Sequence, residues 1–210
     1  MNKTLYIDNF TFWTENETEK IPDVSFIPAM LRRRMSVLEK IAISLVVRIT
    51  PKSDDYQIVF ASRFGEWEQT IKLIRQFYED KEMSPMGFSN SVHNAAMGHL
   101  SLLTHNKNSY TSIAGGEKTI ENALLDAICS AQPTLFVYAE EHSPKEYEHL
   151  FERPVLSHGC ALFIDKNGKN KFELLSNNQD LPNLSFQDLQ DCLQNAADIK
   201  TSNWKLIKKQ

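Results

Sequence analysis

Short apolar runs alternate with longer amphipathic segments along the chain. The apolar runs are rich in β-branched and aromatic residues, and they predict strands at 5–12, 57–62, 110–114, 135–139, 160–164 and 172–175. The amphipathic segments repeat apolar residues at helical spacing, and they predict helices at 37–49, after residue 65, and at 84–103, 117–131 and 184–197. This alternation predicts an α/β fold with a mostly parallel sheet and flanking helices.

Serine and proline mark the ends of two of these helices. Ser36 followed by Glu39 is the pattern of a capping box, and Pro51 predicts that the same helix has ended. Ser84 followed by Pro85 predicts a further start, because serine caps helix N-termini and proline suits the first turn. The sequence therefore predicts helix starts at residues 37 and 85.

Two further patterns concern packing. The helix after residue 65 has four apolar residues on one face: Ile71, Ile74, Phe77 and Tyr78. The turn Lys166-Asn167-Gly168 separates two predicted strands, so we expect 160–164 and 172–175 to pair across it as a hairpin.

Composition narrows the class of protein. The chain has 210 residues, of which 41% are hydrophobic and 24% charged, and we expect one domain over 1–210 with a helix-containing C-terminal extension at 177–210. The net charge of −4 gives no broad basic field, so nucleic acid is not expected as a partner. Three cysteines without a CxxC pair fit a reducing compartment, and no apolar run reaches the ~20 residues of a membrane span. These features predict a cytoplasmic protein.

Neither a metal nor a cofactor is expected. Histidines 93, 99 and 105 are six residues apart, which spreads them around a helix instead of aligning them on one face. The run from Gly115 to Thr119 lacks the glycine spacing of a phosphate-binding loop. It is better interpreted as a tight turn between a strand and a helix.

The segment 84–102 carries a family signature. It fits the pattern S-P-x8-N-x3-G-x-[IL]-[ST]-[IL] without a gap, through Ser84, Pro85, Asn94, Gly98, Leu100, Ser101 and Leu102. In these residues the chain resembles the β-ketoacyl synthase N-terminal domain family, and weaker matches extend the resemblance over about residues 1–176. The resemblance implies the N-terminal half of a thiolase-like fold.

The resemblance also locates a missing nucleophile. Ketosynthases carry a cysteine where the helix after the 110–114 strand begins, because the helix dipole and backbone amides activate a thiol there. A gapless alignment places Glu117 at that position, and a shift of one or two residues places Gly116 or Gly115 there. The two catalytic histidines of the family belong to the second half of its fold, beyond the span of this chain. The resemblance therefore implies that the chain is not an enzyme on its own.

Half-length proteins of this kind resemble the chain-length-factor-like subunits of aryl-polyene-type fatty acid and polyketide gene clusters. The resemblance implies a heterodimer or larger complex with a full-length β-ketoacyl synthase, in which this chain stabilises the synthase and bounds its acyl tunnel. Acyl carrier protein is the second partner that it suggests. The implied interface and tunnel-wall residues are Phe64, Met86, Gly87, Phe88 and Met97. A lone half of the fold would also leave an apolar face that needs cover.

Other functions stay open on the sequence. The chain could be a stand-alone acyltransferase or hydrolase using Cys160 or Ser112, or a docking module for acyl carrier protein. The basic run 32–34 could serve such docking, although a solvated face is the simpler interpretation. Glu140-Glu141-His142, at the end of a predicted strand, is interpreted as a solvated loop because no nucleophile is placed beside it.

Overall fold

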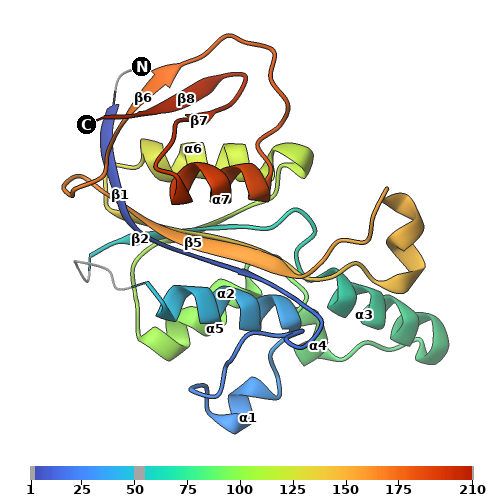
Figure 1. The fold of residues 1–210 in the computed structure, drawn as a ribbon. Helices are drawn as coiled ribbons and strands as arrows, with labels where there is room; N and C mark the ends of the chain where they lie inside the picture. The colour runs from blue at the N-terminus through green and yellow to red at the C-terminus, as the bar shows by residue number, and fades with distance from the viewer. Residues whose placement is uncertain (1–2, 50–54, 210) are drawn as a thin grey trace.

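The computed structural model describes residues 3–49 and 55–209 and shows a mixed eight-stranded sheet with helices on both faces (Figure 1). The strand order is β3-β2-β4-β5-β1-β6-β8-β7. The strands are β1 (Lys3–Thr14), β2 (Gln57–Ala61), β3 (Tyr110–Ile113), β4 (Thr134–Glu140), β5 (His158–Asp165), β6 (Lys171–Ser176), β7 (Ile199–Lys200) and β8 (Trp204–Lys208).

The helices follow the predicted order. They are α1 (Ala29–Arg32), α2 (Val37–Val47), α3 (Trp67–Asp80), α4 (Pro85–Ser89), α5 (Ala95–Thr104), α6 (Thr119–Cys129) and α7 (Phe186–Gln194). Two 3₁₀ turns, η1 (Gly116–Lys118) and η2 (Lys145–Leu150), complete the described elements. The α/β class is confirmed.

The prediction of a mostly parallel sheet is wrong. Only the pairs β2–β3 and β2–β4 are parallel, and the other paired strands of the described chain run antiparallel. Helices connect β2 to β3 and β3 to β4, whereas the loop between β4 and β5 holds only a 3₁₀ turn. A strand buried on both faces is continuously apolar in either orientation, so the apolar runs could not reveal the direction of β5.

The predicted hairpin of β5 and β6 is also wrong, because β1 lies between them. Tyr6 is opposite Asp165 of β5 on one side and Lys171 of β6 on the other. The turn before β6 instead folds over Asp8, whose carboxylate accepts hydrogen bonds from the backbone N–H groups of Lys169 and Asn170 at 2.7–3.0 Å. A local turn pattern cannot show that a strand from the far end of the chain inserts between two sequence neighbours.

One layer of helices covers the first face of the sheet. α2 and α5 pack there, and the capping box of α2 is confirmed: Ser36 Oγ accepts from Glu39 N at 2.9 Å and Glu39 Oε2 accepts from Ser36 N at 3.0 Å. Pro51, the predicted stop signal of this helix, lies outside the described residues. The core on this face is therefore built around a helix whose start the sequence specifies closely.

The predicted helix 84–103 is divided into α4 and α5. Ser84 caps α4 as predicted, with its Oγ accepting from Gly87 N at 3.2 Å. α4 then ends at Ser89, where Ser91 Oγ donates to the carbonyl of Phe88 at 2.9 Å. Short polar side chains that bind the neighbouring backbone compete with helical hydrogen bonds, and this explains a break in the run 89–91.

The C-terminal extension covers the second face of the sheet. α7 and the strands β7 and β8, which the sequence did not predict, form a layer beside α6 (Figure 1). Leu184, Leu189, Leu193, Ile199, Trp204 and Leu206 are all buried in the core cluster that contains the apolar side of α6. The chain itself thus covers the apolar face of α6.

We predict that this extension contributes directly to global stability. Leu189→Ala removes a fully buried side chain beside α6 and should lower the free energy of unfolding by about 2–5 kcal/mol, as cavities in packed cores do. Leu102→Ala is the matched control, because Leu102 is exposed and should cost under about 0.5 kcal/mol. Urea denaturation measures both, and an equal effect of the two variants would mean that the extension is not part of the cooperative core.

Candidate functional site

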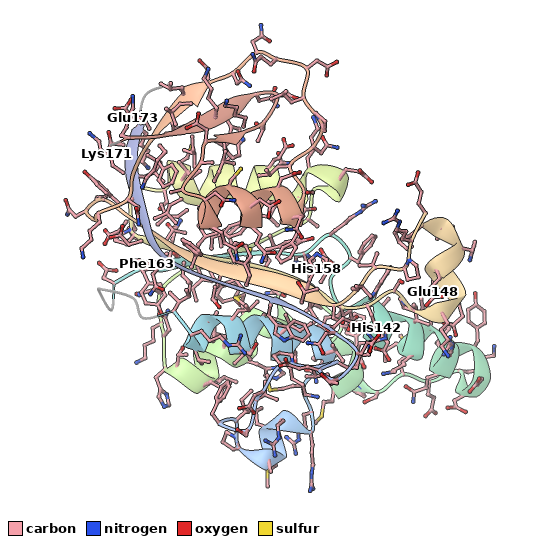
Figure 2. The ribbon with its side chains drawn as sticks, viewed as in Figure 1. His142, Glu148, His158, Phe163, Lys171 and Glu173 are labelled. Carbon is pink, nitrogen blue, oxygen red and sulfur yellow. The ribbon has the colours of Figure 1, made fainter. Side chains whose placement is uncertain are left out.

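The carboxyl ends of β2, β3 and β4 meet at one edge of the sheet, because these three strands are parallel. The segments after β2 and β3 carry Arg63 and Glu117, and β4 itself ends at Glu140. His142 and His158 lie at the same end of the sheet (Figure 2). This edge contains the position at which the sequence resemblance places the family nucleophile.

A tight turn forms the nucleophile position. Gly116 adopts a φ of +59°, a left-handed conformation that favours glycine. Thr119 Oγ1 accepts from Gly115 N at 2.9 Å and donates to Gly116 O at 2.7 Å, which closes the turn in front of α6. Glu117 projects from this turn into solvent and pairs with Arg63 at 2.8 Å. Near the position where the resemblance places the family nucleophile, the chain therefore carries a carboxylate paired with a guanidinium.

A cavity of about 230 Å³ lies behind this ion pair. Its wall includes Glu117, Tyr138 and His158, and the C-terminal extension closes one side with Leu184 and Phe186. The Phe186 and His158 rings are 4.6 Å apart. Glu121 Oε1 fixes the extension by accepting from Leu184 N at 2.7 Å. The cavity is thus sealed on one side by a segment of the same chain.

His158 is held as a neutral imidazole. Its Nδ1 lies 2.7 Å from the carbonyl oxygen of Leu156, which can only accept, so Nδ1 carries the proton. Burial lowers the pKa of His158. Its Nε2 lies 3.4 Å from the Tyr138 hydroxyl. These contacts fix the position of the imidazole. Three hydroxyl side chains line the cavity with it: those of Thr119, Tyr138 and Ser185.

Glu140 shapes the loop after β2. This buried carboxylate accepts from Ser62 Oγ at 3.1 Å, from Phe64 N at 3.4 Å and from Arg63 N. Burial raises the pKa of Glu140 to about 7 despite these hydrogen bonds. The interpretation of residues 140–142 as a solvated loop is wrong for Glu140 and Glu141, since both are buried. The sequence signal for these buried carboxyls is a pair of glutamates at the end of a continuously apolar strand.

A second group of buried carboxyls joins α2, α3 and α5. Glu66, at the N-terminus of α3, accepts from Ser36 Oγ at 3.0 Å, while its other oxygen is buried without a partner among the described residues. Glu39 binds His99 Nδ1 at 2.8 Å. Burial, and next the charge of Glu39, raise the pKa of Glu66 to about 9, so Glu66 is protonated at neutral pH. His99 thus has the structural hydrogen-bonding role that suits a core histidine.

The structure does not bring the five proposed interface residues together. Met86 and Phe88 are each 57% exposed on α4, whereas Met97 is buried against α2. A Cβ at Gly87 would lie 3.0 Å from Leu73 Cδ2, so Gly87 faces α3. Phe64 stacks on Trp67 with ring centroids 4.4 Å apart. Only Met86 and Phe88 offer an exposed apolar surface.

Exposed apolar side chains of α3 extend that surface. Ile74, Phe77 and Tyr78 share a face of α3 as predicted, but that face points to solvent. α3 packs on α4 through Gly87. We call the exposed apolar residues of the two helices and the segment between them the α3–α4 surface, and they are Ile74, Phe77, Tyr78, Met83, Met86 and Phe88. Exposed apolar side chains on adjacent helices are typical of an interaction surface.

Neither alternative nucleophile has catalytic surroundings. Cys160 is fully buried, and burial strongly raises the pKa of its thiol. Ser112 Oγ is buried and forms no hydrogen bond to any described residue. His93, the nearby imidazole, directs its Nε2 to the carbonyl of Ser62 at 2.8 Å. The geometry therefore gives Ser112 no general base.

The described part of the chain shows neither a metal-binding cluster nor a membrane-spanning helix. Within residues 3–49 and 55–209, no cluster of His, Cys, Asp and Glu side chains is arranged to hold a metal ion. No helix in those ranges is long and apolar enough to cross a membrane.

The mixed sheet with helices on both faces is the fold of a thiolase-like α/β protein of the ketosynthase type. Residues 9–207 match the family model of the β-ketoacyl synthase N-terminal domain, and the chain belongs to that family. No curated protein matches the sequence significantly. The resemblance expected from residues 84–102 is thereby confirmed.

Solved structures share the fold. The ketosynthase ApeO in complex with its chain length factor ApeC from Xenorhabdus doucetiae matches with a TM-score of 0.76 and 21% identity, over 98% of this chain and 99% of that one. The ishigamide ketosynthase/chain length factor matches with a TM-score of 0.58 and 21% identity, over 68% and 48%. AntDE:AntF, a type II acyl-carrier protein in complex with its ketosynthase, matches with a TM-score of 0.60 and 13% identity, over 85% and 70%.

Thiol reactivity separates an inert fold from a thiol enzyme. We predict that iodoacetamide at pH 7.5 leaves Cys160 unmodified in the folded chain, because the thiol is buried and its pKa is raised. Cys129 is exposed and serves as the internal control, and all three cysteines should react after denaturation. Mass spectrometry of the peptides gives the rates. Modification of folded Cys160 as fast as that of Cys129 would support a reactive thiol.

The buried carboxyls predict a pH dependence of stability. Between about pH 4.5 and its folded pKa of about 9, Glu66 keeps a proton in the folded state that it loses in the unfolded state, so stability falls as pH rises. His158 acts in the opposite direction below about pH 6.5, which makes pH 7–9 the informative window. The urea midpoint should fall across that window.

Glu66→Gln tests which group is responsible. Glutamine keeps an oxygen for Ser36 Oγ and cannot ionise, so the fall between pH 7 and 9 should become shallower in this variant. Glu146→Gln is the control, because Glu146 is exposed and its pKa lies below the ordinary value. If the urea midpoint fell equally between pH 7 and 9 in Glu66→Gln and in the parent chain, Glu66 would not be the responsible group.

Proposed function

We propose that the chain is a non-catalytic, chain-length-factor-like partner of a full-length β-ketoacyl synthase in fatty acid or aryl polyene biosynthesis. In this role it stabilises the synthase and bounds its acyl tunnel. The observation that carries the proposal is the turn before α6, where the resemblance places the family cysteine and this chain has Glu117, paired with Arg63, or one of two glycines. A carboxylate is a poor acyl acceptor for this chemistry, whereas the fold around it is kept.

Chain length supports the same role. The match to the complex of ApeO and its chain length factor covers nearly all of both aligned chains, so the aligned chain of that complex is about as long as this one. The aligned chain of the ishigamide complex is about twice as long as the matched region. A match over nearly all of an aligned chain in a ketosynthase–chain length factor complex supports a role for this fold beside a synthase.

The accessible surface suggests where the synthase binds. The C-terminal extension covers α6, so that face is not available without displacing Leu184, Leu189 and Trp204 from the core. The α3–α4 surface is exposed and apolar at Phe77, Met86 and other positions. Stable subunit interfaces typically bury about 2,000 Å² or more and are apolar at the centre. We propose that the synthase covers the α3–α4 surface and that Met86 and Phe88 adjoin its acyl tunnel.

Co-purification tests the role and the surface together. Phe88→Asp and Phe77→Asp place a charge on exposed positions, so the chain should fold normally but lose a co-expressed full-length synthase, because an unpaired charge in an interface costs several kcal/mol. Met30→Asp is the matched control, since Met30 is exposed on α1, outside that surface. Met97 is unsuitable for this test, because a charge in the core would unfold the chain.

The synthase itself provides the second measurement. Condensation of malonyl and acyl groups on carrier protein should require the synthase and should be undetectable with this chain alone. Product from the purified chain would contradict the non-catalytic role. Retention of the synthase by both aspartate variants would leave the role intact and move the interface elsewhere.

A further inference from the structure

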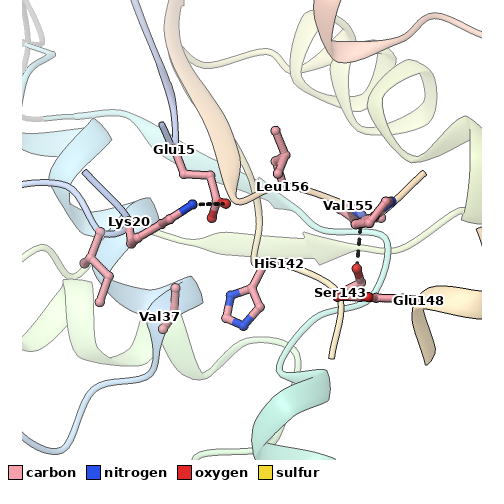
Figure 3. A pocket seen from close by; sticks show the side chains of 10 residues that line it. Glu15, Lys20, Val37, His142, Ser143, Glu148, Val155 and Leu156 are labelled. Atoms are coloured by element: carbon pink, nitrogen blue, oxygen red, sulfur yellow. Dashed lines mark hydrogen bonds and ion pairs between the residues drawn. The ribbon is translucent and has the colours of Figure 1, made fainter. Parts of the chain in front are cut away.

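His142 lines two cavities, and Figure 3 shows the first of them. The first has a volume of about 380 Å³ and the second about 240 Å³, and His142 lines both. We call the two cavities together the His142 groove. Neither cavity contains residues of the α3–α4 surface or of the turn before α6.

The first cavity is mostly apolar. Its apolar walls are Ile21, Val37, Pro154, Val155 and Leu156, and its polar lining residues are Glu15, Lys20, His142, Ser143 and Glu148. Ile21 is 40% exposed and Leu156 is 50% exposed, so large apolar side chains face water there. Pockets of about 300–1,000 Å³ with apolar walls and a few polar groups are typical ligand sites. The cavity is large enough for a leucine or phenylalanine side chain.

Hydrogen bonds hold these walls in place without a ligand. Ser143 N donates to Val155 O at 3.0 Å, and Val155 N donates to Ser143 Oγ at 3.1 Å, which closes the loop 143–155 at its base. Glu15 N donates to Ser157 O at 2.9 Å, which joins the loop to the end of β1. A preformed pocket binds more tightly because little order is lost on binding.

The second cavity carries an excess of positive charge. Lys72 pairs with Glu68 at 2.9 Å, and Arg75 pairs with Glu146. Lys145 also lines the cavity and has no ion-pair partner among the described residues. Three cations thus face two carboxylates. A negatively charged group would complete the charge balance.

We propose that the His142 groove binds an extended segment of a partner protein, with a bulky apolar side chain in the first cavity and a carboxylate in the second. The segment 142–145 connects the two cavities, and three residues of extended chain span at most about 10 Å. An extended ligand with its apolar and acidic residues three positions apart has the same reach as this segment, which begins at the first cavity with His142 and ends at the second with Lys145. A small molecule would fill only one of two chemically different cavities. This site does not depend on the function proposed above.

Three synthetic hexapeptides test the proposal against the full ¹⁵N-labelled chain by NMR. One has leucine and glutamate three positions apart among glycines, the second has lysine in place of glutamate, and the third has serine in place of leucine. The first should give saturable shifts at the amides of Ile21, Val155 and Lys145. The peptide with serine in place of leucine should bind about tenfold or more weakly. The peptide with lysine in place of glutamate should bind about two- to fivefold more weakly.

Variants of the chain complete the test. Ile21→Glu and Lys145→Glu should weaken binding of the first peptide by similar factors, because each changes one cavity at an exposed position. Phe26→Glu and Arg33→Glu, also at exposed positions and outside the groove, are the matched controls and should bind as the parent chain does. Absence of saturable shifts at millimolar peptide, or equal binding of all three peptides, would overturn the proposal.

Discussion

The pairing of β1 with both β5 and β6 is the interaction on which the rest of the structure depends. Phe12 lies opposite Cys160 of β5, while Leu5 lies opposite Phe172 of β6. On the β5 side lie the strands that carry the altered nucleophile turn, and on the β6 side lie the strands of the C-terminal extension. Without β1 between β5 and β6, the strands of the extension would have no hydrogen-bonded pairing with the rest of the sheet to hold the extension over α6.

Hydrogen bonds within the chain hold the loops at the carboxyl ends of the parallel strands. The turn before α6 is stabilised by Thr119, and the loop after β2 by Glu140, so neither depends on a thiol. The ion pair of Glu117 with Arg63 is partly exposed and adds little stability, since such pairs contribute about 0–1 kcal/mol. The loops at this edge of the sheet are thus held by their own hydrogen bonds, while an exposed apolar surface lies on α3, α4 and the segment between them.

The sequence predicted elements better than their arrangement. The capping box at Ser36 and the cap at Ser84 are local signals, and both helix starts are confirmed. Strand direction, the insertion of β1 and the pairing of β8 depend on contacts between distant segments, which no local pattern records. For the candidate site, the resemblance located the turn at Glu117, but it could not indicate that Met97 is buried or that Gly87 faces α3, because a helical period does not say which face meets the core.

The central place of β1 has a consequence for the order in which the chain folds. β1 is synthesised before its partner strands, and Lys3 can reach its partner Leu174 only after the residues between them have been made. Such distant pairing is slow, because loop closure must precede the contacts that stabilise it. During that interval β1 presents unpaired backbone groups and α6 lacks its cover, so the nascent chain is exposed to aggregation until the extension arrives. A chaperone that binds during synthesis would therefore be expected to bind β1 and α6, because both pack against segments that are synthesised later.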